Sequence, residues 1–205
     1  MIPVETYLQR AGLALVGHSV SLSALGPHWL HDSPLLEDCT LAEADLLGAG
    51  MLRVQARSGQ VLVTEGDAGN WMMLVLSGTV DVTRRGLVRS AGPRAAPGGA
   101  GAAFAGQGGD AEIIRLAVLK AGAAFGEMSM LDGEPRLATC TAIETVEVGV
   151  MTRPAIARLI HDHPAVGAKL LVKLTQLLAQ RLRNTSNQIV RMLEEDSNEW
   201  APSQK

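Results

Sequence analysis

Phe125–Thr139 reads FGEMSMLDGEPRLAT, a stretch in which charged residues stand among apolar ones. Glu127 follows Gly126 directly, and Arg136 comes nine residues after Glu127. The flanking Phe and Leu residues suggest that the segment lies against a core, where a charged group needs a partner. Either Glu127 and Arg136 form an ion pair at the corner of a sheet, or both bind a ligand.

The residue types in this stretch favour a ligand that carries a phosphate and a sugar. Met128–Leu131 is expected to form one helical turn, whose free backbone N–H groups attract an anion. Gly126 lets a ligand approach the backbone closely. Arg136 offers a planar fork that suits a phosphate, and Glu127 offers an acceptor for a sugar hydroxyl. Phosphate together with ribose describes a nucleotide.

Short apolar runs separated by turn residues surround this stretch. From Met51 the chain reads MLRVQA, QVLVTEGDAG, WMMLVLSG and TVDVTRRG, and similar runs return as AEIIRLAVLKAG and LATCTAIETVEVGVMT. Their β-branched residues and Gly-containing turns are typical of an antiparallel meander. The predicted fold class is α+β, with an antiparallel β-roll or jelly roll of the cupin-like kind and flanking helices.

The chain is expected to divide into four parts. Residues 1–32 carry apolar residues at uneven helical spacing and are interpreted as an N-terminal helical extension. Residues 33–163 are predicted to form the roll, whose Gly-, Ala- and Pro-rich segment 86–111 is predicted to be a flexible loop. Residues 164–197 are predicted to form a long C-terminal helix, and 198–205 a tail. Within the roll, Thr40 and Glu43 have the spacing of a helix capping box.

The long helix carries an apolar seam that favours a homodimer. Leu171, Leu178, Thr185 and Met192 recur every seven residues, flanked by Leu174, Leu182 and Ile189. This heptad spacing is typical of a coiled coil. Thr185 and its neighbour Ser186 interrupt the seam, so they either fix the register of the helices or contact something else.

Composition limits the remaining function classes. The net charge of −3 gives no overall basic surface for nucleic acid or anionic lipid. Two cysteines and no recognisable leader predict a cytoplasmic chain with reduced thiols, and the longest run of large apolar residues, WMMLVL, is too short to cross a membrane. An enzyme and a metal site are not expected, and Arg84, Arg85, Arg89 and Arg94 are interpreted as a solvated charge run.

FGEMSMLDGEPRLAT closely resembles the phosphate-binding cassette of cyclic-nucleotide-binding domains, which reads Phe-Gly-Glu, a few apolar or small residues, then Pro-Arg-x-Ala-Thr. The turns at Gly59, Glu65–Asp67 and Ser77–Gly78 also fall where that family has turns. Within the family the chain is most similar to the bacterial cAMP receptor protein (catabolite activator) type. The long helix of that type carries Arg-Leu-x-x-Thr-Ser, and RLRNTS spans Arg181–Ser186 here.

The resemblance implies a ligand, cAMP, and a role for each matching residue. Glu127 would accept a hydrogen bond from the ribose 2′-hydroxyl, Arg136 would pair with the cyclic phosphate, and Thr185 and Ser186 would reach the adenine from the two subunits. Leu137 lacks the hydroxyl that cGMP-selective relatives present to guanine, which favours cAMP. The full set of predicted ligand-binding residues is Phe125, Gly126, Glu127, Met128, Ser129, Arg136, Leu137, Ala138, Thr185 and Ser186.

The sequence also departs from the bacterial type. Relatives of that type follow the long helix with a DNA-binding helix-turn-helix, whereas this sequence continues only with SNEWAPSQK. The expectation is therefore a sensor without direct DNA binding, which signals to an unknown protein partner through its C-terminal helix. The alternative is a scaffold or interaction subunit with a vestigial pocket, or a sensor of cGMP or cyclic di-GMP.

Overall fold

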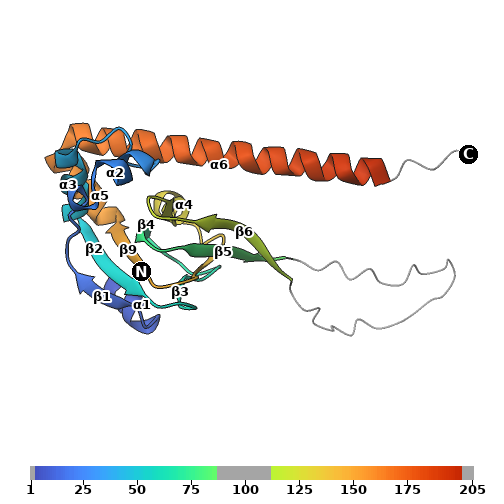
Figure 1. The fold of residues 1–205 in the computed structure, drawn as a ribbon, viewed down its shortest axis with the longest axis horizontal. Coiled ribbons are helices and arrows are strands. Elements are labelled where there is room, and N and C mark those ends of the chain that lie inside the picture. The colour runs from blue at the N-terminus through green and yellow to red at the C-terminus, as the bar shows by residue number, and fades with distance from the viewer. Residues whose placement is uncertain (1–2, 87–111, 200–205) are drawn as a thin grey trace, which may run out of the picture.

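Two antiparallel sheets form a β-roll, and a long helix runs along one side of it (Figure 1). The computed structural model describes residues 3–86 and 112–199. The predicted loop 86–111 and tail 198–205 therefore lie almost wholly outside the described residues. The antiparallel roll with flanking helices and a long C-terminal helix confirms the predicted fold class.

The first sheet has the strand order β1-β2-β9-β4-β7, and the second has the order β3-β8-β5-β6. Neighbouring strands such as β4 and β9 pair antiparallel, with Met73 opposite Val150. The strands are β1 Ala14–Gly17, β2 Met51–Ala56, β3 Val61–Val63, β4 Trp71–Ser77, β5 Val80–Arg85, β6 Ile113–Leu119, β7 Ala124–Phe125, β8 Thr139–Ala142 and β9 Val146–Thr152.

The apolar run in β4 is continuous because the strand is buried on both faces. Trp71, Met73 and Val75 face the core cluster that the two sheets share. Met72, Leu74 and Leu76 alternate with them and belong to a second cluster, which the helices cover. A strand buried on both faces has no polar side, so its sequence does not alternate.

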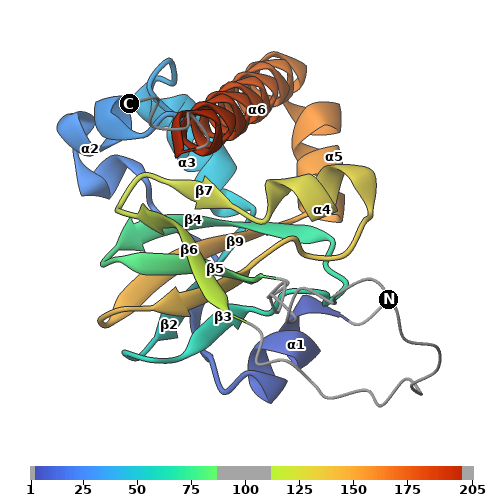
Figure 2. The same cartoon turned by 90° about the vertical axis from the view of Figure 1, so that its right-hand side faces the viewer.

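The helices cover the five-stranded sheet from one side, and α1 lies on the opposite side of the molecule (Figure 2). Their bounds are α1 Val4–Arg10, the 3-10 helix η1 Ser23–Leu25, α2 Pro27–Asp32, α3 Leu41–Ala49, α4 Glu127–Asp132, α5 Arg153–Asp162 and α6 Pro164–Glu199. The predicted capping box of Thr40 and Glu43 opens α3. Within the described residues, no helix is both long enough and apolar enough to cross a membrane.

The interpretation of residues 1–32 as a helical extension is wrong for one segment. α1 and α2 are helices, but β1 pairs antiparallel with β2 and extends the first sheet. The side chains of β1 are largely exposed, so backbone pairing along the edge of β2, not an apolar pattern, makes it a strand. The sequence therefore carries little periodic signal for this strand.

The first half of α6 belongs to the core of its own chain. Leu170 and Leu174 are buried in the helix-covered cluster, so Leu174 packs within the chain and does not flank an external seam. Lys169 pairs with Glu43 at 2.7 Å, and Lys173 pairs with Glu37 at 2.7 Å. These contacts fix the start of α6 against the segment around α3, while its second half extends beyond the roll (Figure 1).

Candidate functional site

The turn between β7 and α4 is built around a glycine that no other residue replaces easily. Phe125 ends β7 and pairs with Met73 of β4, which anchors the turn in the shared core. Gly126 has a φ of 75° and is the N-cap of α4. A Cβ at Gly126 would lie 2.6 Å from Nη1 of Arg136, so both the backbone conformation and the space require glycine.

Arg136 is buried and is held by backbone groups from three segments. Its Nη1 donates to the carbonyl of Gly126, and its Nη2 donates to the carbonyl of Trp71 at 2.7 Å. Its backbone N–H donates to the carbonyl of Asp67 at 2.9 Å, and its own carbonyl accepts from Gly66 at 2.9 Å. Burial lowers the pKa of Arg136 from its usual value, yet an arginine stays charged in proteins. The side chain is thus a buried cation in a fixed position.

Glu127 is buried at the start of α4 and reaches the long helix. Its Oε1 forms an ion pair with Nη1 of Arg181, and Nη2 of Arg181 donates to the carbonyl of Ala124 at 2.6 Å. Arg181 therefore ties both the acid and the preceding strand to α6. A second tie comes from Arg153 at the start of α5, whose Nη2 donates to the carbonyl of Leu131 in α4.

Each of the two charged side chains has one atom without a hydrogen-bond partner. Among the described residues, Nε of Arg136 and Oε2 of Glu127 have no hydrogen-bond partner, although both atoms are buried. We call Nε of Arg136 the open donor and Oε2 of Glu127 the open acceptor. Buried polar groups in native proteins are nearly always paired. A ligand that offers an anionic oxygen and a hydroxyl would satisfy both atoms.

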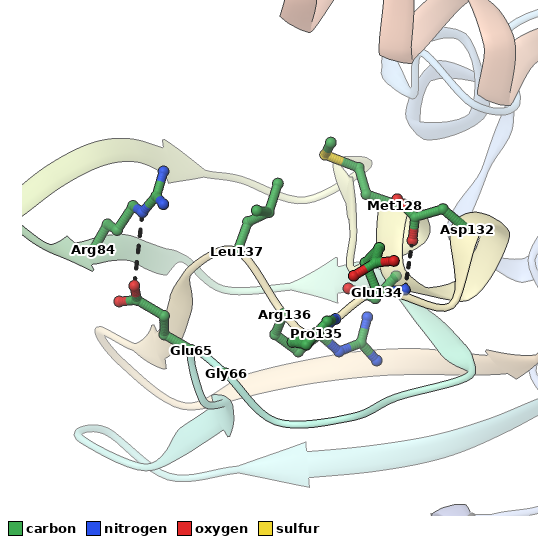
Figure 3. A pocket seen from close by; sticks show the side chains of 10 residues that line it. Glu65, Gly66, Arg84, Met128, Asp132, Glu134, Pro135, Arg136 and Leu137 are labelled. Carbon is green, nitrogen blue, oxygen red and sulfur yellow. Dashed lines mark hydrogen bonds and ion pairs between the residues drawn. The ribbon is translucent and has the colours of Figure 1, made fainter.

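A cavity of about 470 Å³ lies against the cassette (Figure 3). This volume falls in the usual range for small-molecule sites. Glu65 and Arg84 form an ion pair of 3.6 Å on one side, and the backbone N–H of Glu134 donates to Oδ1 of Asp132 on the other. The lining consists of Glu65, Gly66, Arg84, Met128, Ser129, Asp132, Glu134, Pro135, Arg136 and Leu137.

The structure brings most of the predicted site residues together. Four of them line the cavity, namely Met128, Ser129, Arg136 and Leu137. Gly126 and Glu127 contact Arg136 and Arg181 beside it, and Phe125 lies in the core. Ala138 is half-buried after Leu137. Thr185 and Ser186 are exposed on α6, and the described lining of the cavity does not include them.

Sequence reasoning missed several residues of the site. Trp71 reads only as strand core. Gly69 reads only as a turn residue, although a Cβ at this position would lie 2.4 Å from Nη2 of Arg136. Arg181 was part of the RLRNTS motif, but its pairing with Glu127 follows only from the fold. Arg84 was interpreted as one of a solvated run, yet it lines the cavity and pairs with Glu65.

Comparisons with known proteins agree on one family. The family model described as cyclic nucleotide-binding domain matches residues 53–163. A CRP-like cAMP-activated global transcriptional regulator of Mycobacterium tuberculosis is 28% identical over 135 residues, which are 66% of this chain and 49% of that protein. The cyclic AMP receptor protein of Thermus thermophilus is 32% identical over 151 residues, 74% of this chain and 58% of that protein.

A solved structure is similar over nearly its whole length. A cyclic nucleotide-binding domain from Methylobacillus flagellatus has a TM-score of 0.67 and 29% identity, covering 88% of this chain and 89% of its own. By contrast, the chain spans about half the length of the first curated relatives it matches.

Proposed function

Because the chain belongs to the cyclic nucleotide-binding domain family, we propose that it is a regulatory protein that binds cAMP. The open donor and the open acceptor carry this proposal, since a cyclic nucleotide supplies a phosphate oxygen to the one and a ribose hydroxyl to the other. Two relatives named for cAMP support this choice of nucleotide. The proposed activity is binding and signalling, without catalysis.

In this proposal Arg136 pairs with the cyclic phosphate and Glu127 accepts from the ribose 2′-hydroxyl. Leu137 is half exposed at the cavity and offers no hydroxyl to a guanine, which favours cAMP over cGMP. The backbone that completes the anion site is that of Gly126, Met128, Ser129, Leu137 and Ala138.

Calorimetric titration with cAMP, cGMP and cyclic di-GMP tests the proposal. We expect saturable one-site binding of cAMP, weaker binding of cGMP, and no heat with cyclic di-GMP. Tighter binding of cGMP or cyclic di-GMP would replace the proposed ligand. If no nucleotide gives heat, the pocket is vestigial and the chain is an interaction subunit.

Binding of the nucleotide would be transmitted to α6 through the ion pair between Glu127 and Arg181. The ribose hydroxyl and the Arg181 guanidinium would then use the two oxygens of one buried carboxylate. A hydroxyl that donates to the open acceptor would weaken the attraction between the Glu127 carboxylate and Arg181. The Arg181 guanidinium would then shift, together with its hydrogen bond to the carbonyl of Ala124. The ligand shifts the equilibrium between two positions of α6 only as far as its affinities for these two positions differ. The proposed output is a contact between α6 and a partner protein.

The second half of α6 supports a homodimer. Leu182 is 69% exposed and Ile189 is 53% exposed on this part of the helix. Apolar residues at heptad spacing on an unpacked helix suit a second copy of the same helix. Thr185 lies between Leu182 and Ile189, so Thr185 and Ser186 would contact the base across the dimer interface.

Replacing Thr185 with Leu tests this arrangement. We expect a tighter dimer in sedimentation velocity, because the seam becomes fully apolar, together with at least several-fold weaker cAMP binding. Asn187→Leu adds a leucine at an exposed position of α6 that belongs to neither heptad row, and should alter neither property. Unchanged cAMP affinity in the Thr185 variant would return Thr185 to a purely structural role.

A further inference from the structure

Helix α1 closes the end of the roll that lies away from α6 (Figure 2). Val4 and Leu8 are buried in the core that the two sheets share, and the hydroxyl of Tyr7 donates to the carbonyl of Leu62 at 3.3 Å. α1 also lies outside residues 53–163, the part that matches the family. It therefore lies outside the matched segment and still packs into the core of the roll.

Tyr7 connects α1 to the buried arginine of the site through one aromatic residue. The rings of Tyr7 and Trp71 have centroids 4.8 Å apart and planes at 50°. Trp71 in turn contacts Arg136 twice, because Cζ of Arg136 lies 4.9 Å from the centre of its ring and its carbonyl accepts from Nη2. Trp71 is only 2% exposed, so the position of its ring depends on the residues that pack against it.

We propose that Tyr7 is a positioning residue for Arg136, and that docking of α1 is coupled to ligand binding. The inference rests on the proposed function, because it assigns a regulator to the same anion site. With the Tyr7 ring in place, the Trp71 ring has one packed orientation, and the guanidinium lies over it with Nε as the open donor. When α1 leaves, Trp71 gains room to change rotamer, and the guanidinium loses the surface that orients it.

The coupling works in both directions. If docked α1 raises the affinity for the nucleotide, the nucleotide must stabilise docked α1 by the same factor. A protein or a modification that draws α1 away from the roll would then release the ligand. The N-terminal segment is in this way a second input to the sensor, on the side of the roll opposite the long helix.

Calorimetry on Tyr7 variants tests the positioning role. Tyr7→Ala should weaken cAMP binding about five- to tenfold, within the usual range for coupled sites. Tyr7→Phe keeps the ring and should bind within about twofold of the unaltered chain, because ring packing alone positions Trp71. Val54→Ala removes volume from the same core on β2 and controls for general destabilisation, so it should keep its affinity.

Hydrogen exchange tests the reciprocal effect without any substitution. The amide of Ala11 donates to the carbonyl of Tyr7, and that of Leu13 donates to the carbonyl of Leu8. Both report on docked α1, because a helix of 7 residues does not persist without its packing on the roll. Saturating cAMP should slow their exchange, and it should no longer do so in Tyr7→Ala. The inference is overturned if Tyr7→Ala binds cAMP as tightly as the unaltered chain, or if Val54→Ala loses as much affinity as Tyr7→Ala. It is also overturned if cAMP leaves the exchange rates of these two amides unchanged. If the unaltered chain binds no nucleotide, the proposed function fails first.

Discussion

Replacing Arg136 with Ala is expected to lower cAMP affinity by about 3 kcal/mol, roughly a hundredfold, in a calorimetric titration. The phosphate would lose a charged donor inside a buried site, where hydrogen bonds to charged groups are strongest. The carbonyls of Gly126 and Trp71 would lose their donors at the same time, so part of the loss comes from a less ordered cassette.

Two further variants separate charge from geometry. Arg136→Lys keeps the positive charge but has no Nε donor and no planar fork, so most of the affinity should still be lost. Gly69→Ala retains the arginine itself, but the added Cβ would lie 2.4 Å from Nη2 and 2.7 Å from Nε of Arg136. The guanidinium then has to leave its position, and affinity should fall while the fold persists. Binding that Arg136→Ala does not change would mean that the phosphate lies elsewhere.

The cassette could be predicted from the sequence because its chemistry is local. Gly126, Glu127 and Arg136 lie within one short segment, and the need for a close approach, an acceptor and an anion partner follows from the residue types alone. The roll could be predicted for a related reason, since strand runs and turns are short-range signals. The structure confirms the roll and the helical turn that follows the left-handed Gly126, whereas the ligand roles of the cassette residues stay predictions.

The contacts that orient the cassette could not be predicted, because they join segments far apart in the chain. Trp71 is 65 residues from Arg136, and Arg181 is 54 residues from Glu127. Each of these residues has an ordinary local interpretation as strand core or helix surface. β1 was missed because its side chains are exposed, and Leu174 was misplaced because heptad spacing does not distinguish an external seam from a helix that packs on its own core.

Replacing Arg181 with Ala is expected to destabilise the fold by about 3 kcal/mol. Glu127 is 0% exposed, so the substitution leaves a buried carboxylate without its cation. The expected value is at the low end for a broken buried pair, because Arg181 is 39% exposed and water screens part of the interaction. Chemical denaturation of the variant measures the change in unfolding free energy. Arg183→Ala, an exposed arginine on the same helix, should leave that free energy unchanged.

A double-mutant cycle with Glu127→Gln shows whether the two residues act as a pair. Glu127→Gln removes the buried charge and leaves Arg181 partly solvated, so it should cost less than Arg181→Ala, and the double variant should cost less than the sum. The same variants test signalling to α6. In the unaltered chain, cAMP should change hydrogen exchange around Arg181, whereas in Arg181→Ala it should still bind but leave that exchange unchanged. A response of α6 that survives the loss of Arg181 would place the route elsewhere. The hydrogen bond between Arg153 and Leu131 and the packing of Met130 in the helix-covered cluster also join the cassette to the C-terminal helices.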